Sequence, residues 1–332
     1  MGDILHSMPA VTALRQAHPQ WFIGWAIEPQ WRGLFCADEC RPGTPDMPLV
    51  DHLHIVAAKK WARSPLNPAT LREMREVRKE IRAMHYDIVV EMQGAVRATM
   101  VARWARTGRI IGEAQPREFA AKWFFNEKVK TRGVHVIEQS LEVANAICGE
   151  DLPMTLPLLP HDPAADSKAA QLPQPFVLLS PGAGWGAKRW PAERYGSVAR
   201  QFADAGYGVA INCGPGEEHL AGEIVQSSGG AARALTLNMA ELIALTRRAS
   251  LAIAGDTGPL HLACALGVPV VGIYGPTDPA RNGPFHCANR VLRHPESVRD
   301  HSRRSEPEAG LLTITPEAVT SAALDLLREG KQ

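Results

Sequence analysis

The sequence predicts an α/β protein built from two doubly wound domains with parallel sheets. Short apolar runs alternate with amphipathic stretches along the chain, which is the pattern of strands and helices in such sheets. The length of 332 residues suits two domains of ordinary size. A proline-rich stretch near the middle interrupts the pattern, with prolines at positions 153, 157, 160, 163, 173 and 175. Because each proline removes a backbone donor and restricts the residue before it, this stretch indicates a linker.

The α/β pattern on each side of the linker sets the predicted domains. We expect an N-terminal domain over residues 1–155, a linker over 156–175, and a C-terminal domain over 176–314. A final helix over 315–332 follows the start signal Thr315-Pro316-Glu317 and can pack back on the N-terminal domain.

The N-terminal half has fewer clear elements than the C-terminal half. Apolar residues from Ile4 to Leu14 lie at helical spacing, residues 71–85 and 135–148 suit helices, and 21–27 and 87–91 suit strands. In the C-terminal half the pattern predicts strands over 176–180, 208–213, 251–254 and 268–274, with helices over 191–206, 217–227, 238–248 and 257–266.

Charge and cysteine content argue against several classes of protein. Lys plus Arg is 36 and Asp plus Glu is 35, so the net charge of +1 speaks against bulk nucleic-acid binding. The six cysteines form no Cys-x-x-Cys pair, and no histidine cluster completes a zinc set, so we predict no metal site and free thiols. Scattered free thiols suit a reducing compartment. The start shows no signal-peptide pattern, and the longest apolar run is too short to span a bilayer.

The segment Gly255-Asp256-Thr257-Gly258-Pro259-Leu260-His261 is the central motif. It links an apolar strand to a helix that Asp256 or Thr257 caps and Pro259 begins. A helix N-terminus offers free N–H groups and the positive end of the helix dipole, so a diphosphate belongs there. Thr257 and His261 are four residues apart and share a helix face. The alternative is a plain capped helix with a buried histidine.

Three further turns follow predicted strands. In residues 181–191, small residues would let backbone amides approach a phosphate and Lys188 would add a charge, although such a turn can be purely structural. Glu217 or Glu218 could accept hydrogen bonds from ribose hydroxyls, or simply favour the first turn of a helix. Residues 274–279 form a turn rich in glycine and proline. At the other end of the chain, Asp3 could act as a base beside a helix N-terminus, or be a solvated terminal residue.

Together these motifs resemble the lipopolysaccharide heptosyltransferases of glycosyltransferase family 9, and among them the heptosyltransferase I type. The resemblance covers almost the whole chain and is strongest at residues 255–261 and 274–279; residues 188–191, 91–94 and 1–6 match less closely. It implies the GT-B fold, in which two Rossmann-like domains face each other across a cleft. It also implies metal-independent, inverting transfer of heptose from ADP-heptose to Kdo of Kdo-lipid A, without a cofactor.

The resemblance also assigns roles to individual residues. Asp3 matches the general base. Donor-binding positions are matched by Lys188, Glu217 (with Glu218 as the alternative), Asp256, Thr257, Gly258 and His261. Basic positions that meet the anionic acceptor are matched by Arg63, Arg97 and Arg117, with Arg97 standing where a Lys is usual. A lipid acceptor implies a cytoplasmic protein in peripheral contact with the inner membrane, with Trp61 and Arg63 among the contacts.

One departure from the family pattern concerns the first strand. The family begins with a strand and a short loop before Met-Gly-Asp, whereas this sequence begins at Met1-Gly2-Asp3. We expect a missing first strand to leave a gap in the N-terminal sheet, and the natural start to lie upstream. Two alternatives stay open: a non-catalytic relative that binds an ADP-sugar, and a GT-B transferase with another sugar or acceptor.

Overall fold

A computed structural model describes residues 1–37, 40–300 and 304–330. The chain forms two compact units. Residues 6–160 make the N-terminal unit, and residues 161–332 together with Met1–Leu5 make the C-terminal unit. The sequence-predicted boundary at 155/156 therefore lies close to the observed change of unit at Pro160.

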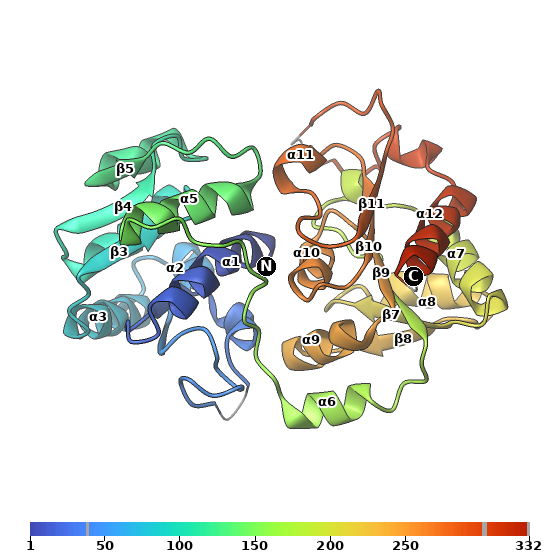
Figure 1. Ribbon diagram of the computed structural model, residues 1–332, viewed down its shortest axis with the longest axis horizontal. Helices are drawn as coiled ribbons and strands as arrows, with labels where there is room; N and C mark the ends of the chain where they lie inside the picture. Colours follow the sequence, from blue (N-terminus) through green and yellow to red (C-terminus); the bar gives the residue numbers. More distant parts are fainter. Residues whose placement is uncertain (38–39, 301–303, 331–332) are drawn as a thin grey trace. The chain divides into compact units, whose positions relative to one another are not determined.

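The C-terminal unit is a doubly wound domain, as the sequence predicts (Figure 1). Its six parallel strands lie in the order β11-β10-β9-β6-β7-β8, which is the Rossmann strand order. The strands are β6 (Phe176–Ser180), β7 (Gly208–Cys213), β8 (Arg233–Thr236), β9 (Leu251–Gly255), β10 (Val270–Tyr274) and β11 (Asn289–Arg293).

Helices cover both faces of this sheet because successive side chains on a strand point to opposite faces. On β6, Val177 and Leu179 belong to one buried cluster, and Phe176 and Leu178 belong to the other. The first face is covered by α7 (Ala192–Asp204), α8 (Glu218–Ser227) and α12 (Pro316–Glu329). The second is covered by α6 (Pro163–Ala169), α9 (Met239–Arg248) and α10 (Gly258–Ala265). Short helical elements are η4 (Gly186–Lys188), α11 (Pro279–Asn282) and η5 (Leu311–Thr313).

Two helices of this unit lie in the segments expected to form the linker and the C-terminal helix. The second half of the expected linker contains α6, which Asp162 caps through Ala165 N at 2.9 Å and whose Ala165 and Ala169 are buried. A proline is compatible with a helix at its first position, where Pro163 stands. The final helix α12 packs Val319, Ala323, Leu326 and Leu327 into the core of its own unit.

The N-terminal unit has two parallel sheets in place of the single sheet of a doubly wound domain. One pairs β1 (Gly24–Ile27) with β2 (His52–Ile55), and the other has the order β3 (Ile88–Glu91), β4 (Arg109–Glu113), β5 (Glu127–Val129).

Two helices of the N-terminal unit pack against each other through apolar side chains. Ala10, Ala13 and Leu14 of α1 share a buried cluster with Ala144 of α5. The elements are α1 (Gly2–Ala17), η1 (Pro29–Leu34), α2 (Ala58–Arg63), α3 (Pro68–Ala83), α4 (Val96–Ala102), η2 (Arg103–Ala105), η3 (Phe119–Phe124) and α5 (Val136–Cys148).

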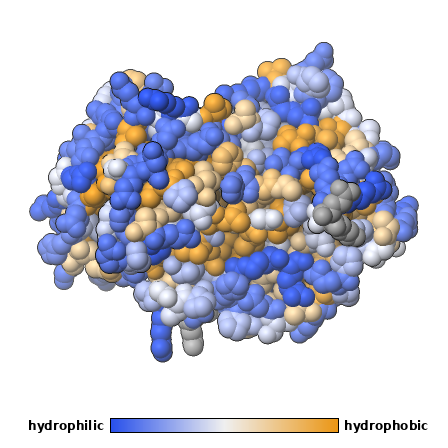
Figure 2. All heavy atoms as spheres, viewed as in Figure 1, coloured by the Kyte–Doolittle hydropathy of each residue, from blue (hydrophilic) through white to orange (hydrophobic). Residues whose placement is uncertain are grey.

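The face shown in Figure 2 carries both hydrophilic and hydrophobic residues, and hydrophobic residues adjoin one another over part of it. Among the described residues, no helix is both long and apolar enough to cross a bilayer.

Candidate functional site

The candidate site lies where the strand order of the C-terminal sheet changes direction. Strand β6 pairs with β7 on one side and with β9 on the other, so the chain leaves β6 and β9 at neighbouring points of one sheet edge. In doubly wound sheets, ligands bind beyond the carboxyl ends of the strands at this switch point. The loops that follow β6 and β9 are the two that carry Lys188 and Asp256.

Asp256 is held by two side chains at once. Lys188 Nζ forms an ion pair with its Oδ2, and His261 Nε2 lies 3.2 Å from its Oδ1. The three side chains are between 7% and 11% exposed. Sequence motifs separated by 68 residues therefore meet in one cluster, which we call the Lys188–Asp256–His261 cluster.

The surroundings of Asp256 keep its carboxyl group ionised. Burial alone would raise the pKa of Asp256, because it disfavours the charged form. The hydrogen bond from His261 and the charge of Lys188 act in the opposite direction and outweigh burial, so the pKa lies well below its usual range. The cluster therefore contains a buried anion that neutralises the ammonium group of Lys188.

The N-terminus of α10 lies directly after Asp256. Thr257 occupies the N-cap position with extended backbone, but its side chain makes no capping hydrogen bond. Thr257, one of the two residues predicted to cap this helix, is thus its N-cap residue, but its hydroxyl donates to the carbonyl oxygen of Gly255 at 3.2 Å and not to the helix. Without a side-chain cap, the positive end of the helix remains available to an anion.

The Glu217 side chain contacts the glycine-rich loop after β6. Its carboxylate accepts a hydrogen bond from Gly214 N at 2.9 Å and lies against Gly182, where an added Cβ would be 2.3 Å from Oε1. A side chain at position 182 would therefore require the Glu217 carboxylate to move. Glu218, the alternative acid, is exposed and accepts from Gly216 N at 3.2 Å. Of the two acids, it is Glu217 that contacts the loop.

Lys188 is oriented by a second contact besides Asp256. Its ammonium group lies 4.4 Å from the centre of the Trp185 ring, within the range of a cation–π interaction. Trp185 is the N-cap residue of η4 and Lys188 is its last residue, so the loop that carries the lysine also supplies the aromatic ring.

Asp3 is exposed in the first turn of α1 and belongs to the C-terminal unit. Its neighbour Gly2 lies beside His261, since an added Cβ on Gly2 would be 3.1 Å from His261 Cδ2. Met1 lies against Gly258, where an added Cβ would be 2.6 Å from Met1 Sδ. The start of the chain is therefore adjacent to the first turn of α10.

Two of the three arginines assigned to the acceptor lie at one junction of the N-terminal unit. Glu118 N donates to Gly94 O at 2.8 Å, and Glu118 Oε2 accepts from Val96 N at 2.9 Å. Arg97 and Arg117 are the exposed neighbours of Val96 and Glu118. Arg63 is also exposed, but it stands on a different element, at the end of α2.

The expectation that Trp61 contacts a membrane is wrong. The Trp61 side chain is buried, and its indole N–H donates to Glu73 Oε2 at 3.0 Å. A buried tryptophan usually finds a hydrogen-bond partner for its indole N–H, as Trp61 does here. Large exposed apolar residues occur instead at Met100, Phe119 and Trp123, which the sequence analysis did not single out.

A second cluster was also missed from the sequence. His52, His54 and Glu80 place three metal-ligand atoms within 4.8 Å of one another, although Glu80 is 26 residues from His54. The spacing of two histidines two residues apart on a strand is the one sequence signal that could have found it.

Comparison with known proteins identifies relatives over most of the chain. The family model described as glycosyltransferase family 9 (heptosyltransferase) matches residues 74–311. Lipopolysaccharide heptosyltransferase 1 of Pseudomonas aeruginosa is 24% identical over 297 residues, covering 86% of this chain and 79% of the relative. Lipopolysaccharide heptosyltransferase 2 of Escherichia coli K12 is 25% identical over 344 residues, covering 96% and 93%.

A solved structure supports the same relationship at the level of the fold. The structure of E. coli heptosyltransferase WaaC with ADP superposes with a TM-score of 0.79 at 25% identity, covering 97% of this chain and 95% of that one.

Proposed function

The chain belongs to glycosyltransferase family 9, the heptosyltransferases, and has their GT-B fold, and we propose that it transfers heptose from ADP-heptose to Kdo of Kdo-lipid A. It is a glycosyltransferase by family. The observation that carries the proposal is the Lys188–Asp256–His261 cluster beside the uncapped N-terminus of α10.

The donor diphosphate would bind at the start of α10. The backbone N–H groups after Thr257 and the ammonium group of Lys188 are suited to two phosphates. Glu217 would accept hydrogen bonds from the ribose hydroxyls of the adenosine. Support for the nucleotide comes from the relative that was solved with ADP.

The proposed chemistry is a single inverting displacement. The acceptor hydroxyl oxygen forms a bond to the anomeric carbon while the bond from that carbon to the ADP oxygen breaks, and the electron pair leaves with ADP. The hydroxyl proton passes to the carboxylate of Asp3. Lys188 and the helix N-terminus stabilise the negative charge that develops on the diphosphate.

Sequence identity to the relatives does not distinguish between the two acceptor sugars. Relatives named heptosyltransferase 1 and heptosyltransferase 2 match this chain at nearly equal identity. We assign Kdo as the acceptor sugar from the order of the sequence motifs. Arg63, Arg97 and Arg117 would bind the anionic groups of Kdo-lipid A, because guanidinium groups pair with carboxylate and phosphate in two-point contacts.

A lipid acceptor calls for contact with the cytoplasmic face of the inner membrane. Phe119 and Trp123 are 65% and 69% exposed on η3, and Lys122 stands between them with its ammonium group 3.4 Å from the Phe119 ring centre. Aromatic rings next to basic side chains suit the interface of an anionic bilayer. We propose η3 as the peripheral membrane contact.

The test is a transfer assay with the purified protein. Incubation with ADP-heptose and Kdo-lipid A should release ADP and yield a product heavier by one heptose. An acceptor that already carries the first heptose should give no product. Transfer only to that second acceptor would replace Kdo with heptose in the proposal. ADP binding without any transfer would favour the non-catalytic alternative.

A further inference from the structure

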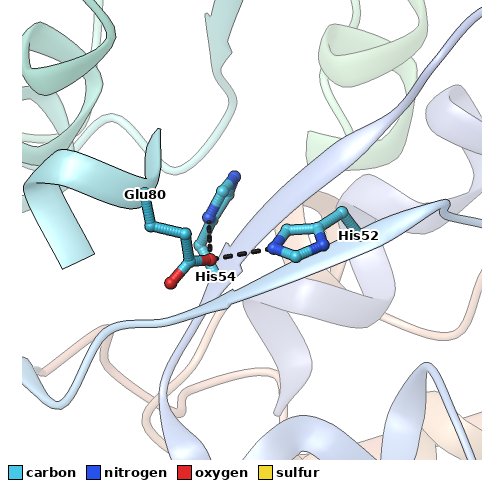
Figure 3. Close-up of side chains that lie close together, drawn as sticks. All are labelled: His52, His54 and Glu80. Carbon is cyan, nitrogen blue, oxygen red and sulfur yellow. Dashed lines mark hydrogen bonds and ion pairs between the residues drawn. The ribbon is translucent and has the colours of Figure 1, made fainter. Parts of the chain in front are cut away.

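Three side chains of metal-ligand type converge beside β2 in the N-terminal unit (Figure 3). His52 and His54 are two residues apart on the strand, so both imidazoles project from the same face. Glu80 reaches them from α3, and its Oε1 lies 2.8 Å from His52 Nε2 and 2.6 Å from His54 Nδ1. Strand β2 and helix α3 thus bring three ligand atoms within 4.8 Å of one another.

Two imidazole nitrogens and one carboxylate oxygen form a ligand set that Zn²⁺ binds in proteins. Ligand atoms around a tetrahedral zinc ion with bonds of about 2.0–2.1 Å are roughly 3.3 Å apart. The two separations from Glu80 Oε1, 2.8 and 2.6 Å, are shorter than this, so that oxygen would have to move back by about 0.6 Å to admit the ion. Glu80 is 43% exposed and its second oxygen points away from both histidines, so its side chain has room for this movement.

The buried histidine has the outer hydrogen bond that metal-bound histidines usually make. His54 is 3% exposed, and its Nε2, the nitrogen opposite the ligand atom, lies 2.8 Å from the hydroxyl of Tyr86. Tyr86 is itself held in place, because its hydroxyl fills the position that a side chain at Gly24 would occupy. Such a partner fixes the orientation of the ring and the position of its proton.

We propose that His52, His54 and Glu80 bind one Zn²⁺ ion, with Tyr86 as the positioning residue for His54. Water would fill the fourth position on the side where His52 and Glu80 are exposed. The ion would join β2 to α3 and so stabilise the N-terminal unit. The site is independent of the proposed transfer reaction, which is expected to need no metal.

The proton on His54 distinguishes a zinc site from a hydrogen-bond network. In the network, Nδ1–H donates to Glu80 and Nε2 accepts from the Tyr86 hydroxyl. In the zinc site, the Nδ1 lone pair binds the ion, so the proton moves to Nε2, which donates to Tyr86. The two arrangements are therefore opposite tautomers, and nitrogen NMR of the imidazole separates them.

Zinc titration of the metal-stripped full chain by calorimetry tests the proposal. We expect one equivalent to bind and the melting temperature to rise with zinc concentration. Glu80→Gln keeps a neutral acceptor for the histidines but should weaken zinc binding at least about tenfold, as should His52→Ala. Tyr86→Phe should weaken it by roughly 10–100-fold. The control is His219→Ala, which removes a 90% exposed histidine that lies 3.4 Å from Glu223.

Three outcomes would overturn the zinc site. The first is the absence of one-equivalent binding to the wild-type chain. The second is unchanged zinc affinity in Glu80→Gln and His52→Ala while His219→Ala lowers it. The third is a His54 proton that stays on Nδ1 in saturating zinc. If Glu80→Gln does not fold, His52→Ala and the NMR measurement still decide, because His52 is partly exposed.

Discussion

Lys188 and Asp256 form an ion pair at the switch point of the C-terminal sheet, although 68 residues separate them in the chain. The other carboxylate oxygen of Asp256 contacts His261. One carboxylate therefore contacts both a lysine from the loop after β6 and a histidine from α10. A buried lysine without a counter-charge would be costly, since removing a charge from water is unfavourable. The pair therefore keeps a charged lysine in place beside a helix N-terminus until an anion arrives.

Removing the ammonium group should impair transfer. Lys188→Met preserves much of the side-chain volume but provides no charge for the leaving diphosphate, so we expect ADP release to fall by about 10²–10³-fold. The matched control is Lys168→Met, because Lys168 pairs with Glu241 at 2.6 Å but is 59% exposed. Wild-type turnover by a folded Lys188→Met variant would exclude Lys188 from catalysis.

Neutralising Asp256 should lower stability, and acid should have the same effect on the wild type. Asp256→Asn leaves Lys188 buried without its partner, which costs about 3–5 kcal/mol in urea unfolding at neutral pH. Because the pKa of Asp256 is depressed in the folded state, its contribution is fully present above the ordinary pKa of an aspartate and is lost as pH falls below that value.

The pH dependence gives a second measure of the same pair. Unfolding free energy of the wild type should decline below about pH 4 more steeply than that of Asp256→Asn. Asp325→Asn is the control, because Asp325 pairs with Arg328 at 3.2 Å on the surface and is 52% exposed. Equal acid sensitivity of wild type and Asp256→Asn would show that the pair does not contribute.

Glu217 and Glu218 provide a matched comparison for the nucleotide site. Glu217→Gln replaces a charged acceptor beside Gly182 with a neutral one, so ADP should bind roughly tenfold or more weakly in calorimetry. Glu218→Gln should bind ADP like the wild type, because Glu218 is exposed and directed to Gly216. The reverse order of the two affinities would move the ribose contact to Glu218.

Substitution of Asp3, the proposed base, should affect turnover without affecting ADP binding. Asp3→Asn should keep the affinity for ADP and lose about 10²–10⁴-fold in transfer rate, since the amide cannot take the acceptor proton. ADP calorimetry and ADP release on the same preparation measure the two quantities. Unchanged transfer would mean that another group accepts the proton.

Membrane contact through η3 is tested with lipid vesicles. Trp123→Ala should reduce co-sedimentation with vesicles that contain anionic lipid, and added salt should reduce wild-type binding through screening of Lys122. Leu66→Ala removes an apolar side chain that is 85% exposed at another surface position. If Leu66→Ala reduces binding as much as Trp123→Ala, the contact is not specific to η3.

The elements of the C-terminal unit were largely predictable because their signals are local. Strands β6 and β7 begin and end at the predicted residues, and α9 starts one residue after the predicted position because Asn238 is its N-cap. Strand β8 was not predicted, since Arg233–Thr236 is mostly exposed and has no buried run. Its strand conformation depends on the hydrogen bonds that β7 supplies.

The amino-acid sequence by itself determined the doubly wound class, the strand-to-helix turn at Asp256 and the charge carried by Lys188. Only the tertiary structure decided that these two residues pair, that α12 packs in its own unit, and that Glu80 meets His52 and His54. The physical reason is the separation along the chain of the residues that interact. Periodicity and capping depend on residues within a few positions of each other, whereas these contacts depend on strand order and helix packing, which bring distant parts of the chain together.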